Sequence, residues 1–439
     1  MESELWEACR DGKVEDVQKL LQNSQIITNW QGRICTPFYI ACENGHIEVV
    51  KLLLNDGRVD INLGDAFDRT PFYIACRYGH IEIVTLLLNN KTVDINKADK
   101  NHQHQKISCL LNDERVDINK ADRNDQTPFY VACEKEHIEI VKLLLNDQRV
   151  NIMKENKHNK TPFYVTCENG YIEIVKLLLN NQRVDINKAN KHDKTPFYVA
   201  CENGHIKIVK LLLNDQRVDI NEANKHDETP FYVACEKGYI EIVKLLLNDQ
   251  RVELNKADDD GETPFYIACR FGRMDVVELL LNDKRIDINH QSILKSNFTA
   301  LHDICRNGYQ LECVRYILAM RREINLNVKD DQGLTPIDIA KEEKDKTPEE
   351  RKRKWTNVIK LLESYERNPN KKRIKLRIQL GFAGIIILIF TYLFNFFFQI
   401  LILSFFLFLY DIYIQDLDAA SIFSMIVFLS DCYLGFKKN

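Results

Sequence analysis

One segment that opens on Thr-Pro recurs along most of this chain, and its recurrence constrains the fold more than any other feature. The clearest copy occupies residues 195–215 and reads TPFYVACENGHIKIVKLLLND. Consecutive copies are spaced by 34 positions and open at Thr127, Thr161, Thr195, Thr229 and Thr263. A fixed period of this length is typical of a solenoid, in which each repeat buries its apolar face against its neighbours.

Each copy reads as two short helices. Thr195 can cap the first helix with its hydroxyl, and Pro196 suits the first helical position because no N–H is needed there. Asn203 and Gly204 tolerate the conformation that ends a helix, and the apolar positions of residues 206–213 recur with helical spacing. Neither helix is long enough to be stable alone in water. The sequence therefore predicts a mainly α solenoid of paired short antiparallel helices, connected by β-turn or hairpin tips.

The pattern T-P-F-Y-x-A-C-x-x-G-H-I-x-I-V-x-L-L-L resembles the ankyrin repeat, and the resemblance covers roughly residues 1–365. The family's Leu-His is mostly Phe-Tyr here, although residues 299–302 (TALH) keep the usual form. We expect a tyrosine hydroxyl to replace the hydrogen bonds of the family's buried histidine. The resemblance implies a scaffold that binds another protein.

Composition and motifs argue against other classes of function. The net charge of −4 does not favour nucleic acid as a partner. The chain contains no Gly-rich phosphate loop, no H-E-x-x-H and no G-x-S-x-G, so we expect no enzyme activity and no cofactor. Most of the 13 cysteines occupy one repeat position and no C-x-x-C spacing occurs, which indicates packing and no metal site. The N-terminus lacks an apolar signal-peptide core, so we expect a cytosolic repeat domain.

Two departures from the period are found in the first third of the chain. Residues 4–22 read as a degenerate first repeat, which suits a cap with a polar outer face. From Thr70 to Thr127 the spacing is 57 positions, and HQHQKISCLLND stands where a TPFYxAC helix is expected. We predict a truncated repeat or hinge at residues 97–126, which would divide the stack into N-terminal repeats (1–96) and a main block (127–365). An error in the gene model is the alternative.

The chain changes character towards its C-terminus. A charged insert at residues 341–354 lengthens the last repeat, which suits a C-terminal cap. Residues 366–379 read as a basic juxtamembrane linker, and residues 371–377 (KKRIKLR) could contact anionic lipid.

The apolar tail that follows suggests a membrane anchor. Residues 380–410 contain no charge, and we predict one or two transmembrane segments within 380–436. A two-span hairpin with both ends in the cytosol is favoured over one span with an interfacial tail. Translated non-coding sequence is a third interpretation.

Ankyrin-like domains bind proteins through their turn tips and the exposed face of each first helix, so the resemblance implies which residues meet a partner. The register assigns these positions to Lys157, His158, Lys160, Glu168, Asn169, Lys191, His192, Lys194, Glu202, Asn203, Lys225, His226, Glu228, Glu236 and Lys237. The tip position that the family gives to glycine holds Asn159, Asp193 and Asp227, which tolerate a left-handed turn.

A Lys-His pair recurs with the repeat period at residues 157–158, 191–192 and 225–226. Stacking should bring the three pairs side by side along one edge. One interpretation is a basic, pH-tunable strip for an acidic partner. The other, which we favour, is recent duplication that copied a solvated turn.

These observations together predict a membrane-anchored adaptor. Its repeats would present a binding surface to an unidentified protein at the cytosolic face of a membrane. The alternative is a subunit of an oligomeric membrane channel or transporter with a cytosolic ankyrin domain.

Overall fold

The computed structural model describes residues 1–31, 34–89, 116–308, 311–320 and 323–380. Its contacts divide the chain into two compact units. The larger unit comprises Met1–Cys313 with Ile324–Val358, and the second comprises Val314–Glu323 with Ile359–Asn439. Within the described ranges all regular structure is helical, apart from an isolated β-bridge between Ser292 and Phe298.

The helices alternate along the chain as the sequence predicts. The first helices of the repeats are α1 (Glu2–Asp11), α3 (Pro37–Glu43), α5 (Pro71–Tyr78), α8 (Pro128–Glu134), α10 (Pro162–Asn169), α12 (Pro196–Glu202), α14 (Pro230–Lys237), α16 (Pro264–Arg270), α18 (Ala300–Asn307) and α20 (Pro336–Lys346). The second helices are α2 (Val14–Leu21), α4 (Ile47–Leu54), α6 (Ile81–Leu88), α9 (Ile138–Leu145), α11 (Ile172–Leu179), α13 (Ile206–Leu213), α15 (Ile240–Leu247), α17 (Met274–Asn282), α19 (Leu311–Met320) and α21 (Arg353–Arg367). Two short 3₁₀ helices, η1 (Ile293–Lys295) and η2 (Glu349–Arg351), lie in connecting segments.

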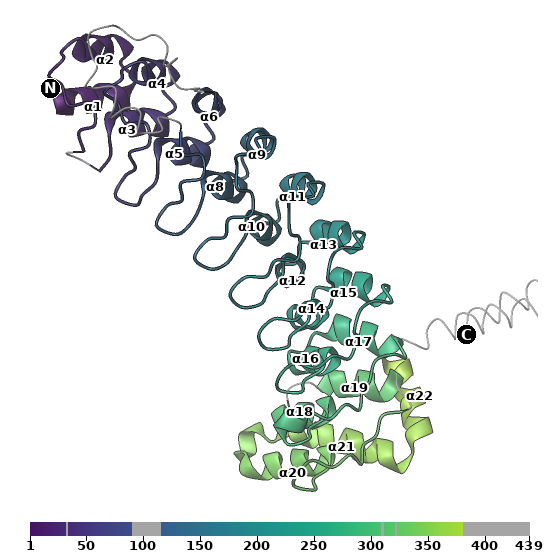
Figure 1. Cartoon of the computed structure of the whole chain (residues 1–439). Coiled ribbons are helices and arrows are strands. Elements are labelled where there is room, and N and C mark those ends of the chain that lie inside the picture. The colour runs from purple at the N-terminus through teal and green to yellow at the C-terminus, as the bar shows by residue number, and fades with distance from the viewer. Residues whose placement is uncertain (32–33, 90–115, 309–310, 321–322, 381–439) are drawn as a thin grey trace, which may run out of the picture. The chain divides into compact units, whose positions relative to one another are not determined.

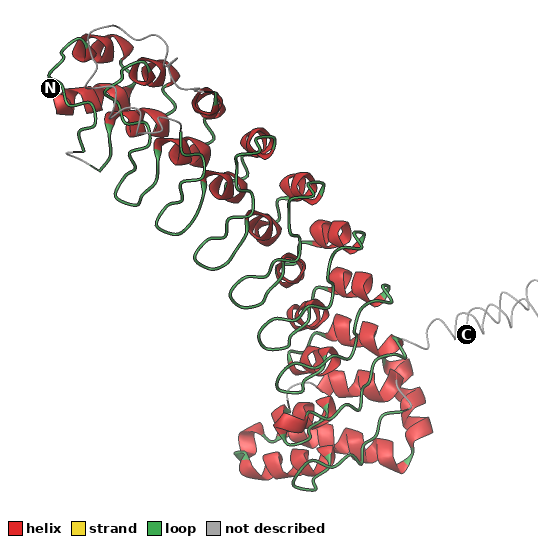
Figure 2. Ribbon diagram, viewed as in Figure 1, coloured by secondary structure: helices red, strands yellow, loops and turns green. Residues whose placement is uncertain are grey.

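The helices of the larger unit form two layers (Figures 1 and 2). Each first helix contacts the next first helix from α1 to α20, and the second helices contact one another in the same way from α2 to α17. Long loops, called fingers below, lead from each second helix to the next first helix and extend beyond the layer of first helices (Figure 2). The core lies between the layers, where the Phe, Tyr, Ala and Cys side chains of the repeat motif are buried.

Local sequence signals start and end the first helices. In α12 the Thr195 hydroxyl accepts a hydrogen bond from the backbone N–H of Tyr198 at 3.1 Å, and Pro196 follows the cap. Helix α10 ends at the cap residue Gly170, which has φ of 84°. A Cβ at this position would lie 2.8 Å from the ring of His205 in the next repeat. A glycine is therefore required by both the backbone and the packing.

The repeats on either side of the long Thr-Pro spacing are direct neighbours. Helix α5 contacts α8, and α6 contacts α9, as between other adjacent repeats. The backbone N–H of Arg123 donates to the carbonyl of Phe67 at 2.9 Å. Nε2 of His137 lies 2.9 Å from the carbonyl oxygen of Arg77. The same kinds of contact recur between the other repeats, so the stack continues here in its normal register.

These contacts join the repeats on the two sides of the division that the sequence predicts at residues 97–126. Residues 116–126 take the place of an ordinary connector that leads to α8, while residues 90–115 lie outside the described part of the chain. The interval from Thr70 to Thr127 is thus one normal 34-residue period with 23 residues added. The sequence pattern suggested a missing part of a repeat, because the added residues duplicate the connector motif.

The segment predicted as a basic juxtamembrane linker is largely helical. After α21, helix α22 spans Pro369–Gln379. Asn368 caps it by accepting from the N–H of Lys371 at 3.3 Å, and Pro369 occupies the first helical position. Within the described residues no helix is both long enough and apolar enough to cross a membrane. The apolar sequence predicted to do so, apart from Leu380, lies outside them.

Candidate partner-binding surface

The fingers that lead to α10, α12 and α14 are called the middle fingers below. A buried asparagine amide holds the base of each of them. The Asn190 side-chain oxygen accepts from the backbone N–H groups of His192 at 2.9 Å and Lys194 at 3.2 Å. Its amide nitrogen donates to the hydroxyl of Tyr164 in the preceding repeat at 2.9 Å. Asn156 and Asn224 bond to tyrosines in the same way. The expectation that tyrosine hydroxyls replace the family's histidine hydrogen bonds is confirmed.

The fingertips lie side by side in a column, which we call the tip column. It consists of residues 123–124, 157–158, 191–192 and 225–226. Lys191 N–H donates to the carbonyl of His158, and Lys225 N–H to that of His192, both at 3.1 Å. The next residue of each tip has positive φ, with 56° at Asn159. Stacking thus aligns the Lys-His pairs, as the sequence predicts.

The tip column is exposed, and acidic residues bound it at both ends. The lysines of the three Lys-His pairs are exposed, as are His158 and His226, whereas His192 is partly buried. At one end, Nε of Arg123 lies 3.1 Å from a carboxylate oxygen of Asp68. At the other, Nδ1 of His226 lies 3.3 Å from a carboxylate oxygen of Asp259. The run of positively charged tips is therefore limited to four repeats.

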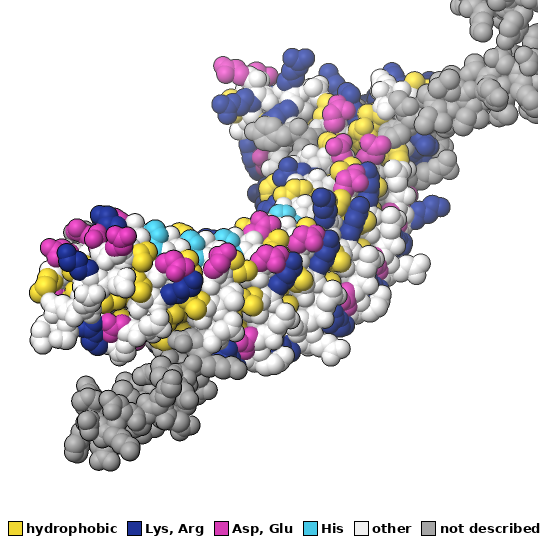
Figure 3. Space-filling view, turned by 90° about the horizontal axis from the view of Figure 1, so that it is seen from above, with side chains coloured by type: hydrophobic (Ala, Val, Ile, Leu, Met, Phe, Trp, Pro, Cys, Tyr) yellow, Lys and Arg dark blue, Asp and Glu magenta, His cyan; other side chains and the backbone are white. Residues whose placement is uncertain are grey.

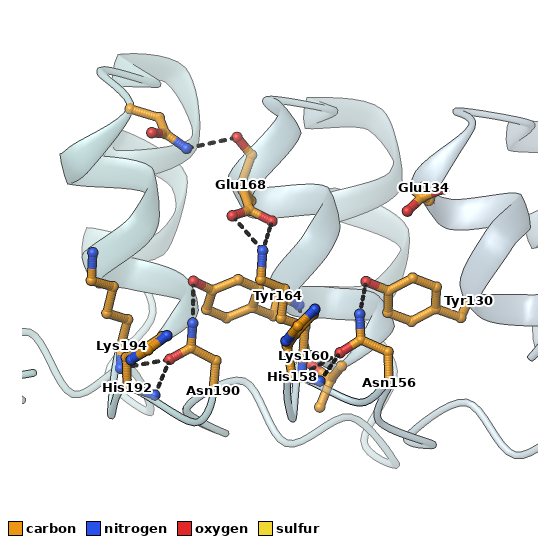
Figure 4. A network of polar contacts seen from close by, with 12 residues as sticks. Tyr130, Glu134, Asn156, His158, Lys160, Tyr164, Glu168, Asn190, His192 and Lys194 are labelled. Carbon is orange, nitrogen blue, oxygen red and sulfur yellow. Dashed lines mark hydrogen bonds and ion pairs between the residues drawn. The ribbon is translucent and has the colours of Figure 1, made fainter. Parts of the chain in front are cut away.

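Several of the predicted site residues pair with one another where the base of a finger meets the first helix that follows it. The surface formed by these finger bases and first helices is called the inner face below. Nζ of Lys160 lies 2.7 Å from a carboxylate oxygen of Glu168 and 5.5 Å from the centre of the Tyr164 ring (Figure 4). Lys194 pairs with Glu202 in the next repeat, also at 2.7 Å. These four charges largely compensate one another, so they contribute less net charge to the surface than the sequence suggests.

The third repeat of the predicted set breaks this pattern. Glu228 stands where Lys160 and Lys194 stand in the other repeats, and it accepts hydrogen bonds from Tyr198 at 3.1 Å and from Asn224 at 2.6 Å. Glu236 instead pairs with Lys237 at 3.1 Å. The inner face therefore changes its charge pattern along the stack while the backbone stays the same.

The remaining predicted residues and several that were missed share one position at the C-terminal end of the first helices. Asn169, Asn203 and Lys237 are exposed there. Sequence analysis overlooked the exposed residues at the same register, which are Tyr78, Lys135 and Phe271. It also overlooked Arg123 in the tip column. Each of these residues could have been found by its fixed offset from the Thr-Pro motif.

The charges around His192 disfavour its protonation. Desolvation and the positive charges of Lys225 and Lys191 hold its pKa below the ordinary histidine value. Lys191 and Lys225 therefore supply the positive charge beside His192 at neutral pH. The face of the molecule shown in Figure 3 likewise has acidic and basic side chains interspersed along the stack.

Comparison with known families assigns the class of this stack. A family model of ankyrin repeats in three copies matches residues 5–99, 97–156, 150–224 and 197–292. A single ankyrin repeat matches residues 296–331. The chain belongs to the ankyrin repeat family, and its stack is a protein–protein interaction module. No curated protein matches the chain.

Proposed function

We propose that this protein is a non-catalytic adaptor that binds a protein partner across the tip column and the exposed ends of its first helices, at the cytosolic face of a membrane. The observation that carries the proposal is the alignment of Lys157-His158, Lys191-His192 and Lys225-His226 by backbone hydrogen bonds between neighbouring tips. Because several repeats present charge at a fixed interval, one extended acidic segment of a partner can contact all of them.

The membrane location is supported by the sequence. Residues 380–410 contain no charged side chain, and basic residues precede them at 371–377. Uncharged segments of this length insert into bilayers, and flanking lysines and arginines favour the cytosolic side. The fifteen predicted residues remain candidates for partner contact, and the tip lysines, His158 and His226 are among the exposed ones.

Site-specific photo-cross-linking in cells tests the proposal. A cross-linking residue at His192 should capture the partner, whereas one at Lys210, an exposed position on α13, should not. Capture at both positions with equal yield would contradict binding through the tips.

The captured protein then allows a quantitative test. Exchanging Lys157, Lys191 and Lys225 for Glu should weaken its binding by at least tenfold, since charges opposite complementary partners steer and hold a complex. Exchanging the three tip histidines for Ala separates the contribution of the rings. Affinity unchanged in both triple variants would refute the role of the tip column.

A further inference from the structure

Helix α22 carries an unusual exposed face. Lys371, Ile374, Lys375 and Ile378 recur at helical spacing, and all four are exposed. Ile374 is 61% exposed and Ile378 is 54% exposed. A surface helix of a soluble protein normally directs its apolar residues inward and its polar residues outward. Here lysine and isoleucine share the outward face.

The inward face of the same helix is occupied by other residues. Leu376 is buried, and Arg373 is buried with its guanidinium over the ring of Tyr365, whose hydroxyl accepts a hydrogen bond from it. These contacts fix the rotation of α22 about its axis. The exposure of the two isoleucines therefore follows from how the helix is packed against α21.

The charge of α22 has one sign. The helix contains Lys371, Lys372, Arg373, Lys375 and Arg377 and no acidic residue. The sequence contains no Asp or Glu from residue 369 to residue 410, and residues 378–410 carry no charge at all. The exposed isoleucines thus lie on a basic helix that leads directly into a long apolar segment.

We infer that α22 lies along the surface of a bilayer that contains anionic phospholipid, with Ile374 and Ile378 inserted between headgroups and Lys371 and Lys375 beside lipid phosphates. An amphipathic helix binds an interface through its apolar face, and lysines attract anionic lipid while their alkyl chains extend along the apolar region. A soluble protein partner would place acidic groups opposite the lysines, but the continuity with residues 380–410 favours lipid. This inference rests on the proposed membrane location and adds a lipid preference to it.

The test uses the full chain in lipid vesicles, with a polarity-sensitive fluorophore on Ile374→Cys. Cys109 and Cys432 are changed to Ser, and the eleven cysteines of the described residues are buried, which limits labelling elsewhere. Vesicles contain phosphatidylcholine alone or with about one third phosphatidylserine. With phosphatidylserine, the label should report an apolar environment and should be quenched by nitroxide lipid.

Charge variants make the test specific. Lys371→Gln with Lys375→Gln should lower the equilibrium constant for docking of α22 about 25-fold, since each lysine near an anionic surface contributes about fivefold. The matched control, Lys207→Gln with Lys210→Gln on α13, removes the same charge and should leave docking unchanged. Equal loss in both double variants would overturn the inference.

Sedimentation of the same samples separates this inference from the anchor. A label that stays in water while the chain sediments with both kinds of vesicle overturns the role of α22 and leaves the anchor standing. Sedimentation only with phosphatidylserine, lost in the Lys371/Lys375 variant, supports α22 and refutes the anchor. A chain that sediments with neither overturns both.

Discussion

The middle fingers and the finger before α16 have the same backbone turn but hold it with different groups. Asn190 uses a neutral amide, which accepts from two backbone N–H groups and donates to Tyr164. Asp258 accepts from the N–H groups of Asp260 at 3.1 Å and Glu262 at 2.7 Å, and from the Tyr232 hydroxyl at 2.8 Å. Both side chains accept hydrogen bonds from the backbone N–H groups of the turn, but only the amide does so without burying a charge.

The consequences of this difference extend beyond one finger. Burial raises the pKa values of Asp258, Glu262 and Asp303 from their ordinary values. Arg270 at 2.6 Å and Lys295 at 2.7 Å from Glu262 oppose part of the effect. The region from α16 to α18 therefore contains three carboxyl groups whose ionised form is less stable in the folded protein than in water. The bases of the middle fingers hold a neutral amide at this position and lack these carboxylates.

The largest expected effect comes from removing a finger-base amide. Asn190→Ala leaves two backbone N–H groups and the hydroxyl of Tyr164 without their partner, which should lower the free energy of unfolding by about 2–3 kcal/mol. Urea denaturation followed by circular dichroism measures the change. Asn169→Ala is the control at an exposed position, with an expected change below about 0.5 kcal/mol. Equal effects at the two positions would show that the finger base does not stabilise the stack.

Much of this finger could be predicted from the sequence, because its determinants are local. The threonine cap, the proline after it, the left-handed turn at Asp193 and the tyrosine bond all follow from residues at fixed offsets within the period. The ion pair between Lys160 and Glu168 could not be read in the same way. It joins the base of a finger to the end of the following helix, eight positions later, and only the folded path of the chain brings the two together.

The continuity of the stack was also hidden from the sequence. A duplicated connector motif and a missing helix give the same local pattern near residues 97–119. The contacts of α5 with α8 and of α6 with α9 distinguish the two cases. Only contacts between residues far apart in the sequence distinguish a duplicated connector from a missing helix, because the repeat period is the same in both cases.

A pH titration sharpens the contrast between the two regions. Because the folded-state pKa values of Asp258, Glu262 and Asp303 are raised, the folded state binds more protons than the unfolded state between the two sets of values. These three carboxyls should therefore raise the free energy of opening at α16–α18 as pH falls towards their folded-state pKa values. Burial lowers the pKa of His302 on α18, which opposes this rise because the folded state then binds fewer protons at that ring. Hydrogen exchange, corrected for intrinsic rates, measures the free energy of opening, with α10–α13 as the internal reference.

The variant Asp258→Asn gives that contrast a matched test. It replaces the carboxylate by the amide of the middle fingers, so it should raise stability at pH 7 and reduce the pH dependence at α16–α18. A pH dependence of protection at α16–α18 that is the same in Asp258→Asn as in the parent chain would contradict the raised pKa of Asp258.

A smaller gain in stability is expected at Met153, where a row of hydrogen bonds between neighbouring repeats is interrupted. On the outer edge, Asn187 accepts from the N–H of Asp219 at 3.0 Å and donates to the carbonyl of Arg217 at 2.7 Å. The equivalent position one repeat earlier is Met153, whose sulfur lies 3.4 Å from the N–H nitrogen of Asp185. Met153→Asn should restore both bonds and raise the free energy of unfolding by about 0.5–1 kcal/mol. The reciprocal change, Asn187→Met, should lower the free energy of unfolding by a similar amount. Changes of the same sign in the two variants would show that these hydrogen bonds do not stabilise the stack.

The central claim is that one uninterrupted stack aligns the fingers, and excision of residues 90–112 tests it most directly. The deletion joins Asn89 to Asp113 and restores the 34-residue spacing between Thr-Pro motifs. If α5 packs on α8 as described, the shortened chain should keep the helical signal of the described repeats and unfold in as many transitions as the parent chain. Its free energy of unfolding should stay the same or rise by about 1 kcal/mol, because fewer residues then separate α6 from α8. Loss of helical signal, or a separate early transition of the first repeats, would show that the stack is divided there.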